Sequence, residues 1–236
     1  MSTTGSLAGK VIAVTGAFGA LGKVVTEVLA AQGAVLALMD LGPPPTMAAM
    51  ERPHLVLDSI NVGDVNAVSA ALAMAVDKLG PLWGLVNIAG GFSMAPVGVD
   101  SVDVWARMHE INLRTAVVAS AAAVPHLKRA GAGRIVNVGA NAAVGPAGAA
   151  MGAYAAAKSG VHRLTESMAE ELKNDGINVN AVLPTILDTP ANRSAMPDAD
   201  HARWVKTTEL AQVIAFLLSV ESSAVTGALI PVRART

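Results

Sequence analysis

The stretch VTGAFGALG, residues 14–22, joins a β-rich run, KVIAVTG (10–16), to a longer run rich in alanine and leucine. Gly16, Gly19 and Gly22 have no Cβ, so the backbone can turn sharply there and a pyrophosphate can approach it closely. The helix that follows would offer free N–H groups and the positive end of its dipole to the phosphates. A strand, a glycine-rich turn and a helix in this order are typical of dinucleotide-binding folds. A tight glycine turn without a ligand is the alternative interpretation.

Two aspartates end the next two predicted strands. Asp40 closes AVLALMD (34–40), 18 residues after Gly22. Its carboxylate can accept hydrogen bonds from both hydroxyls of an adenosine ribose, and it would repel a 2′-phosphate. Because Asp40 is the only charged residue in MDLGPPPT, we expect NAD(H) to be favoured over NADP(H). A solvated loop aspartate is the alternative. Asp58, at the end of HLVLD (54–58), could meet the adenine amino group.

The rest of the chain alternates short β-rich runs with longer runs typical of helices, which predicts a parallel sheet covered by helices on both faces. Because no linker, repeat or low-complexity tract divides the chain, we expect residues 1–236 to form a single doubly wound (Rossmann) α/β domain with about seven strands. A proline-rich stretch, 41–53, is predicted to be a loop. The predicted strands cover residues 10–16, 34–40, 54–58, 81–90, 133–140, 177–184 and 227–232. The predicted helices cover residues 19–33, 63–80, 100–130, 208–219 and part of 151–176.

Composition excludes several classes of protein. The net charge of −1 gives no field that would draw nucleic acid. With no cysteine there are no disulfides and no thiolate sites, which agrees with a reducing cytoplasm, where we expect the protein. The five histidines have no ligand spacing, so we expect no metal site. Two uncharged runs, 79–99 and 135–157, contain glycine, proline and asparagine, so we expect no membrane span. The first ten residues contain no apolar run typical of a secretion signal.

Tyr154, the chain's only tyrosine, stands four residues before Lys158 in an alanine-rich run. Residues at this spacing share a helix face, so the two side chains are expected side by side. An ammonium group beside a phenol stabilises the phenolate. Lowering a phenol pKa from about 10 to near 7 takes about 4 kcal/mol, which a lysine and a nicotinamide cation could supply together. Tyr154 would then exchange a proton with the substrate as hydride moves. An ordinary helix-surface pair is the alternative.

Six stretches, in this order, give the chain a resemblance to the short-chain dehydrogenase/reductase family over nearly its whole length. Two depart from the family pattern: NIAG has isoleucine in place of the second asparagine, and NAVLPTILDT has threonine in place of glycine. The stretches are TGAFGALG (15–22), NIAG (87–90), INLRT (111–115), GRIVNV (133–138), YAAAK (154–158) and NAVLPTILDT (180–189).

The resemblance implies a role for each matching residue. Tyr154 would be the general acid or base, and Lys158 would hold the nicotinamide ribose and lower the tyrosine pKa. Asn112 would fix a water in the proton relay, while the Ile186 main chain and Thr189 would orient the carboxamide. The cofactor-binding residues implied are Gly16, Phe18, Gly19, Ala20, Leu21, Gly22, Asn87, Ala89, Gly90, Tyr154, Lys158, Pro184, Ile186 and Thr189, beside Asp40 and Asp58.

The resemblance also implies a substrate lid and an oligomer. The polar segment near residues 190–206 would cover a small-molecule substrate. Family members pack as homodimers or homotetramers through helices near 100–130 and 151–174. Phe92, just after IAGG, either lines the substrate cleft or is an ordinary loop aromatic.

The family's catalytic serine is missing. Counting back 13 residues from Tyr154 gives Asn141, whereas matching the strand end VNVGA gives Ala140, and neither has a hydroxyl. The stretches 150–164 and 183–204 resemble dihydropteridine reductases, a branch of the family without that serine. Their substrate is a quinonoid ring, which needs a second donor less than a carbonyl oxygen does. Alternatively, the Asn141 amide donates in place of serine and is catalytic.

We therefore expect an NAD(H)-dependent oxidoreductase that acts on a small carbonyl or alcohol. Reduction of a quinonoid ring is one alternative. A dinucleotide-binding sensor that has lost catalysis is the other.

Overall fold

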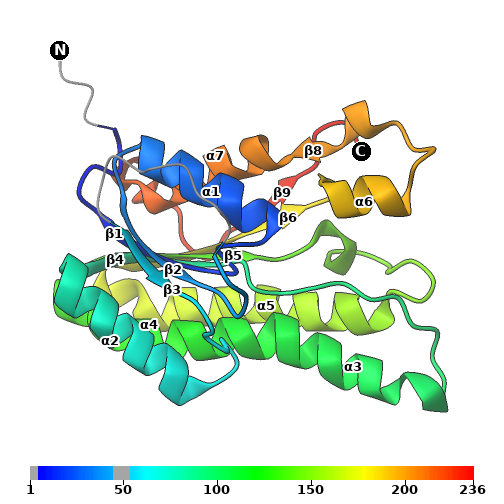
Figure 1. Cartoon of the computed structure of the whole chain (residues 1–236), viewed down its shortest axis with the longest axis horizontal. Helices are drawn as coiled ribbons and strands as arrows, with labels where there is room; N and C mark the ends of the chain where they lie inside the picture. The colour runs from blue at the N-terminus through cyan, green and yellow to red at the C-terminus, as the bar shows by residue number, and fades with distance from the viewer. Residues whose placement is uncertain (1–4, 45–53) are drawn as a thin grey trace.

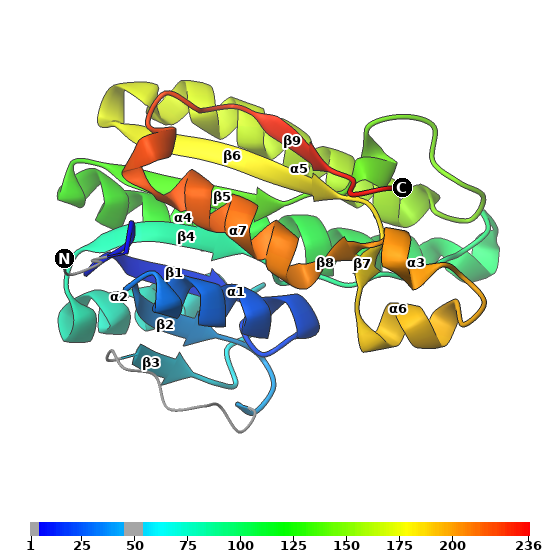
Figure 2. The ribbon, with the colours of Figure 1, turned by 90° about the horizontal axis from the view of Figure 1, so that it is seen from above.

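The computed structural model describes residues 5–44 and 54–236 and shows one α/β domain. Its main sheet has seven parallel strands in the order β3-β2-β1-β4-β5-β6-β9, which confirms the doubly wound sheet expected from the sequence (Figure 2). The strands are β1 (Val11–Thr15), β2 (Val35–Met39), β3 (His54–Leu57), β4 (Leu82–Asn87), β5 (Gly133–Val138), β6 (Ile177–Pro184) and β9 (Leu229–Val232).

Helices cover both faces of the sheet. In Figure 1, α1 and α7 lie above it, and α2, α4 and α5 lie below. A π-helical turn, Glu110–Arg114, joins α3 to α4, so the helix predicted over 100–130 is present with one local change of register. The helices are α1 (Ala20–Ala31), α2 (Val65–Leu79), α3 (Val102–His109), α4 (Thr115–Ala130), α5 (Gly152–Leu172), α6 (Pro190–Ala195) and α7 (Thr207–Leu218).

The central strands are almost entirely buried because helices cover both of their faces. Every residue of β1 is buried. Val11 and Ala13 join the core formed with α2 and α4, whereas Ile12 and Val14 join the core formed with α1 and α7. This alternation follows from the strand's two-residue period.

The strand order reverses between β1 and β4, and in such sheets a ligand binds at the carboxyl ends of the strands beside this point. Side chains join the strand ends there. Thr15 Oγ1 accepts hydrogen bonds from the N–H groups of Ile88 (3.1 Å) and Ala89 (3.2 Å). The loops after β1 and β4 are therefore held together where a ligand would enter.

The segment predicted only as a polar lid has regular structure of its own. It begins and ends with two short paired strands, β7 (Leu187–Asp188) and β8 (Val205–Lys206), and α6 lies between them. Figure 2 places α6 beyond the carboxyl ends of the sheet strands. Most of the predicted proline-rich loop, from residue 45 onward, lies outside the described residues. Within the described part of the chain, no helix is both long and apolar enough to span a membrane.

Candidate active site

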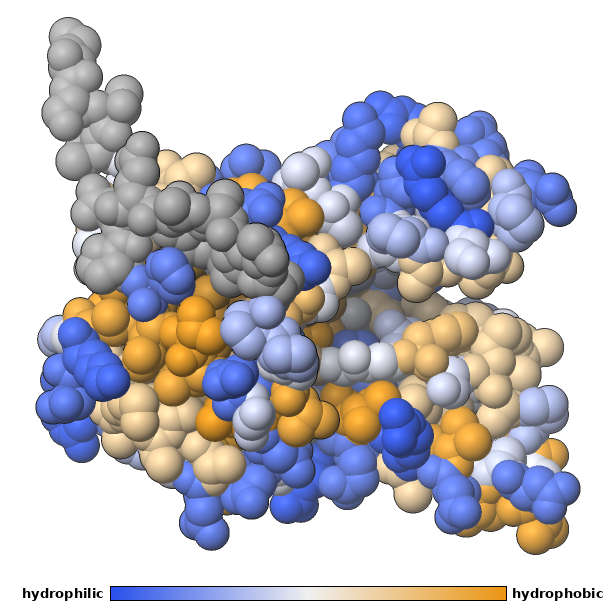
Figure 3. Space-filling view, viewed as in Figure 1, coloured by the Kyte–Doolittle hydropathy of each residue, from blue (hydrophilic) through white to orange (hydrophobic). Residues whose placement is uncertain are grey.

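A cleft of about 770 Å³ opens at the carboxyl ends of β1, β2 and β4. In Figure 3 a deep hollow separates a mostly hydrophilic lobe, which holds α6, from a more apolar lobe below it. The structure brings most of the residues predicted from the sequence to its wall. Those residues are Gly16, Phe18, Gly19, Ala20, Leu21, Gly22, Asp40, Ala89, Gly90, Asn112, Tyr154, Lys158 and Thr189.

The glycine-rich turn has the shape that a phosphate needs. Gly16 has a φ of +65°, and a Cβ there would lie 2.8 Å from the Ala89 nitrogen. A Cβ on Gly22 would collide with the Gly16 carbonyl oxygen. By contrast, a Cβ on Gly19 would make an ordinary 3.5 Å contact, so the fold itself does not require glycine there. Gly19 caps α1 without a side-chain hydrogen bond, which leaves the first N–H groups of the helix free for an anion.

Asp40 closes the cleft beside this turn. Its Oδ2 accepts a hydrogen bond from the Phe18 N–H at 2.8 Å, and its Oδ1 accepts one from the Gly42 N–H at 3.2 Å. A carboxylate has about four lone-pair sites, so both oxygens can still accept further bonds. The two backbone bonds fix the carboxylate at the mouth of the cleft, where it can meet a ribose.

The residue after β3 that reaches the cleft is not Asp58. Asp58 is exposed and is not part of the cleft wall. The chain continues past the strand, and the Ile60 N–H donates to the Asp40 carbonyl at 2.9 Å. Ile60, Asn61 and Val62 then line the cleft in its place. The sequence predicted Asp58, where the apolar run ends, whereas Asn61, three residues later, lines the cleft.

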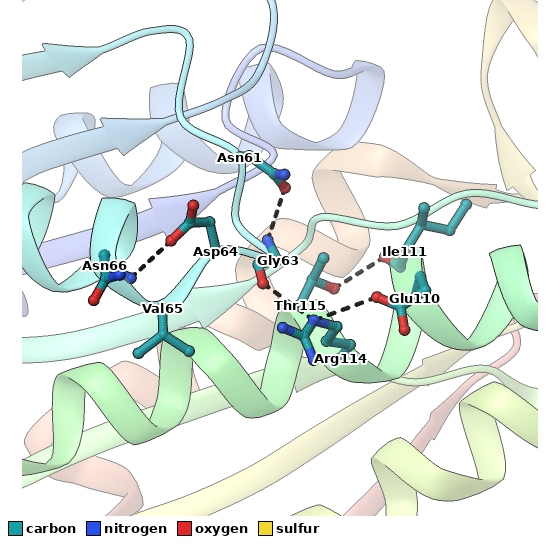
Figure 4. Close-up of a pocket in the computed structure, with 9 residues that line it drawn as sticks. All are labelled: Asn61, Gly63, Asp64, Val65, Asn66, Glu110, Ile111, Arg114 and Thr115. Carbon is teal, nitrogen blue, oxygen red and sulfur yellow. Dashed lines mark hydrogen bonds and ion pairs between the residues drawn. The ribbon is translucent and has the colours of Figure 1, made fainter.

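A second hollow, of about 710 Å³, adjoins the cleft on this side and shares Asn61, Ile111 and Thr115 with it. Figure 4 shows Arg114 between Gly63 and Glu110. Arg114 Nε donates to the Gly63 carbonyl at 3.1 Å and lies 3.3 Å from Glu110 Oε2. Asn61 Oδ1 accepts from the Gly63 N–H at 3.0 Å. These contacts tie the loop after β3 to the π-helical turn and so fix the cleft wall at Asn61.

Asn112 is buried on the π-helical turn, a helical irregularity that is frequent at functional sites. Its side-chain amide holds the loop after β4. Asn112 Nδ2 donates to the carbonyl oxygens of Gly91 and Met108, both at 3.0 Å, and Oδ1 accepts from the Gly91 N–H at 3.2 Å. A Cβ on Gly90 would lie 2.6 Å from Asn112 Oδ1 and 3.6 Å from Lys158 Nζ. Glycine at position 90 therefore allows Asn112 and Lys158 to pack against the loop.

Tyr154 and Lys158 lie on one face of α5 and both line the cleft, as predicted. Lys158 Nζ donates to the Val138 carbonyl at 2.7 Å and lies 6.0 Å from the centre of the Tyr154 ring. Burial lowers the pKa of Lys158 to about 8 and raises the pKa of Tyr154 to about 12. In the protein alone, burial thus outweighs the attraction between ammonium and phenolate. Further positive charge bound beside the phenol would lower the pKa of Tyr154.

The two candidate serine positions lie just after β5, and neither is part of the cleft wall. Ala140 is buried, and its N–H donates to His162 Nε2 at 3.3 Å. Asn141 Oδ1 accepts from Arg233 Nε at 3.0 Å. The Asn141 amide oxygen is therefore held against Arg233 and is not part of the cleft wall. No motif in the sequence predicted this contact of His162, and only its position four residues after Lys158 places it on the same face of α5.

Three more predicted cofactor residues are not part of the cleft wall. Asn87 is buried, and its Nδ2 donates to Asn137 Oδ1 at 2.8 Å and to Ser120 Oγ at 3.0 Å. Its side chain therefore joins β4 to β5 and α4. Pro184 and Ile186 are also absent from the cleft wall, and the Ile186 carbonyl accepts from the Val205 N–H at 3.0 Å. The neighbouring Leu187, which was not predicted, lines the cleft.

The segment between β7 and β8 is held in place at several points. Thr189 Oγ1 accepts from the Asn192 N–H at 3.3 Å and so caps α6. Arg193 makes a two-bond ion pair with Asp188. Trp204 is buried, and its ring lies 4.4 Å from that of His201. The ion pair between Arg193 and Asp188 therefore joins α6 to β7.

Comparison with known proteins gives a consistent result. A family model described as short chain dehydrogenase matches residues 10–200. A trans-4-hydroxycyclohexanecarboxylate dehydrogenase from Sinomonas cyclohexanicum is 35% identical over 237 residues, which cover 94% of this chain and 90% of that protein. A meso-2,3-butanediol dehydrogenase from Serratia marcescens is 31% identical over 94% of this chain and 92% of its own length. The crystal structure of carveol dehydrogenase from Mycobacterium avium in complex with NAD is similar, with a TM-score of 0.87, 29% identity and 98% of both chains covered.

Proposed function

We propose that this chain, which belongs to the short-chain dehydrogenase family, transfers hydride between NAD(H) and a small alcohol or carbonyl compound, with Tyr154 as general acid or base. Family membership makes the chain an oxidoreductase that uses a nicotinamide dinucleotide. The observation that carries the proposal is the position of Tyr154 and Lys158 on one cleft with the glycine-rich turn and Asp40.

Preference for NAD(H) over NADP(H) is supported by Asp40. The Phe18 and Gly42 N–H groups hold its carboxylate at the cleft wall. There it can accept from ribose hydroxyls, whereas a 2′-phosphate would face a fixed negative charge.

The bound nicotinamide would donate or accept the hydride. In the direction of reduction, Tyr154 would give its hydroxyl proton to the substrate oxygen as negative charge develops there. Lys158 would stabilise the phenolate that remains. The Val138 carbonyl holds its ammonium group in place, and the lowered pKa still leaves it mostly charged at neutral pH. Asn112 would fix the loop that carries Gly91, and with it one wall of the site.

A screen of alcohols and ketones tests this proposal, with the reaction followed at the NADH absorbance band and repeated with NADPH. We expect turnover with at least one small alcohol or ketone and a higher kcat/KM with NADH. Tight NADH binding without turnover of any compound would instead favour the dinucleotide-binding sensor.

A second candidate, reduction of a quinonoid dihydropterin, is favoured by one observation. Ala140 has no hydroxyl and neither Ala140 nor Asn141 is part of the cleft wall, so a carbonyl oxygen in the cleft would lack a second donor from either residue. One oxyanion donor contributes about 3 kcal/mol to the transition state. A quinonoid ring spreads the charge and loses less. Faster reduction of the dihydropterin than of any simple ketone would support this candidate.

We also propose that the protein forms a homodimer or homotetramer through α4 and α5 and works in the cytoplasm. The family resemblance supports the first of these, and the absence of cysteine is consistent with the second. Light scattering after size exclusion would measure the number of subunits.

A further inference from the structure

Phe92 forms part of the cleft wall directly beside the proposed acid. Its ring meets that of Tyr154 edge to face, with centres 5.0 Å apart and planes at 84°. Such pairs are favourable beyond the area they bury. Phe92 nevertheless leaves 54% of its surface exposed, although it lines the cleft. A large apolar surface therefore lies free next to the hydroxyl that would meet the substrate.

The position of Phe92 is set by a fixed backbone. Gly91, the residue before it, has both its N–H and its carbonyl bonded to the buried Asn112 side chain. The loop is also joined to the loop before α5, since the Ala95 N–H donates to the Ala150 carbonyl at 2.8 Å. These bonds place the ring of Phe92 more firmly than an ordinary exposed loop would.

The loops after β4 and β5 carry further exposed apolar side chains. Met94 on the same loop is 61% exposed, and Val144 on the loop after β5 is 55% exposed. Figure 3 shows apolar colouring along the edge of the cleft that faces the α6 lobe. Of the hydroxyl side chains on the described cleft wall, Thr115 and Thr189 already bond to backbone groups. The exposed face of Phe92 therefore offers a substrate apolar contact beside Tyr154.

We propose that Phe92 determines substrate specificity: its exposed surface receives an apolar ring that the substrate carries at its carbonyl or carbinol carbon. A ring presents a flat or chair-shaped face that one aromatic side chain can cover. A linear chain of equal size loses more rotational freedom on binding and covers the face less fully. This inference rests on the proposed function, because it places the reacting oxygen at Tyr154.

The test compares two ketones with six carbons each, cyclohexanone and hexan-2-one. Each is titrated into the protein saturated with NAD⁺, where no hydride can move, and its Kd is measured by ligand-detected NMR. We expect the wild type to bind cyclohexanone about tenfold more tightly, a difference of about 1.4 kcal/mol. Phe92→Ala should weaken cyclohexanone binding about tenfold and hexan-2-one binding about threefold or less.

Two further variants serve as controls. Phe92→Leu keeps apolar bulk without the aromatic face and should lie between wild type and Phe92→Ala. Val97→Ala changes a side chain on the same loop that is 88% exposed and does not line the cleft, so neither Kd should change. Equal losses for both ketones in Phe92→Ala, or no preference for the ring in wild type, would overturn the inference. Ring binding that depends on Phe92, without turnover of any alcohol or ketone in the screen, would refute the proposed reaction and leave the specificity site standing.

Discussion

Replacing Lys158 by methionine should stabilise the folded protein near neutral pH while removing most of its activity. The lysine is buried, and burial lowers its pKa from 10.5 to about 8. The difference corresponds to a cost of about 3 kcal/mol for holding the ammonium group in the fold. Methionine avoids this cost but leaves the Val138 carbonyl without its 2.7 Å partner, which costs about 1–2 kcal/mol. We expect a net gain in the free energy of unfolding of about 1–2 kcal/mol.

The stability difference between wild type and the Lys158→Met variant should change with pH. A change in packing alone would give a difference that does not depend on pH. Between pH about 8 and 10.5 the unfolded chain still holds the Lys158 proton and the folded chain has lost it. Wild-type stability relative to the variant should therefore rise with pH, by about 2–3 kcal/mol from neutral pH to pH about 10. Tyr154, whose pKa is raised to about 12, works in the opposite direction above pH about 10, but it is present in both proteins.

Urea unfolding of both proteins, followed by circular dichroism at steps of pH from about 7 to about 10, measures this difference directly. We expect the variant to be more stable than wild type at pH about 7 and to lose that advantage at pH about 10. Unfolding free energies that depend on pH in the same way in both proteins would refute the assignment of a buried, destabilising ammonium group at Lys158. A variant that is less stable than wild type at every pH would also refute it.

Three further variants test other parts of the site. Gly90→Ala puts a Cβ 2.6 Å from Asn112 Oδ1, so it should lower the free energy of unfolding by about 2 kcal/mol and kcat/KM by about tenfold or more. Gly98→Ala is its control, because φ there is −174° and no atom lies within 4 Å. We expect wild type to bind NADH about tenfold more tightly than NADPH, and Asp40→Ala should reduce this difference in Kd. Equal Kd values for NADH and NADPH in wild type would contradict the proposed role of Asp40. Ala140→Ser should raise ketone reduction about tenfold if that position is the vacant serine site, whereas Asn141→Ala should change it little.

The sequence was most informative where one residue type is required by local geometry. Gly16 needs a positive φ and has no room for a Cβ, and the strand–turn–helix pattern around it predicted a dinucleotide-binding turn at the end of the first strand, which lines the cleft. Tyr154 and Lys158 were placed correctly because helix periodicity alone puts them on one face. The apolar run of β1 predicted a buried strand of a parallel sheet, as observed.

Local pattern does not give a side chain's direction where that direction depends on distant parts of the chain. Asn87 ends β4 as expected, and its side chain donates to Asn137 and Ser120 and is not part of the cleft wall. Asn61 reaches the cleft in place of Asp58 because the chain runs three residues past the end of the apolar run. The pairing of β7 with β8 joins residues about 18 positions apart through two-residue strands, which carry no recognisable period.

The central claim, that Tyr154 exchanges the proton during hydride transfer, is tested most directly by Tyr154→Phe. Single-turnover rates of NADH oxidation are measured with a substrate found in the screen, and the Kd for NADH is measured alongside. Ser167→Ala, an exposed change farther along α5, is the control. We expect the phenylalanine variant to lose about 10² or more in rate with an NADH Kd within about twofold of wild type. A variant that keeps most of the wild-type rate on a carbonyl substrate would contradict the claim.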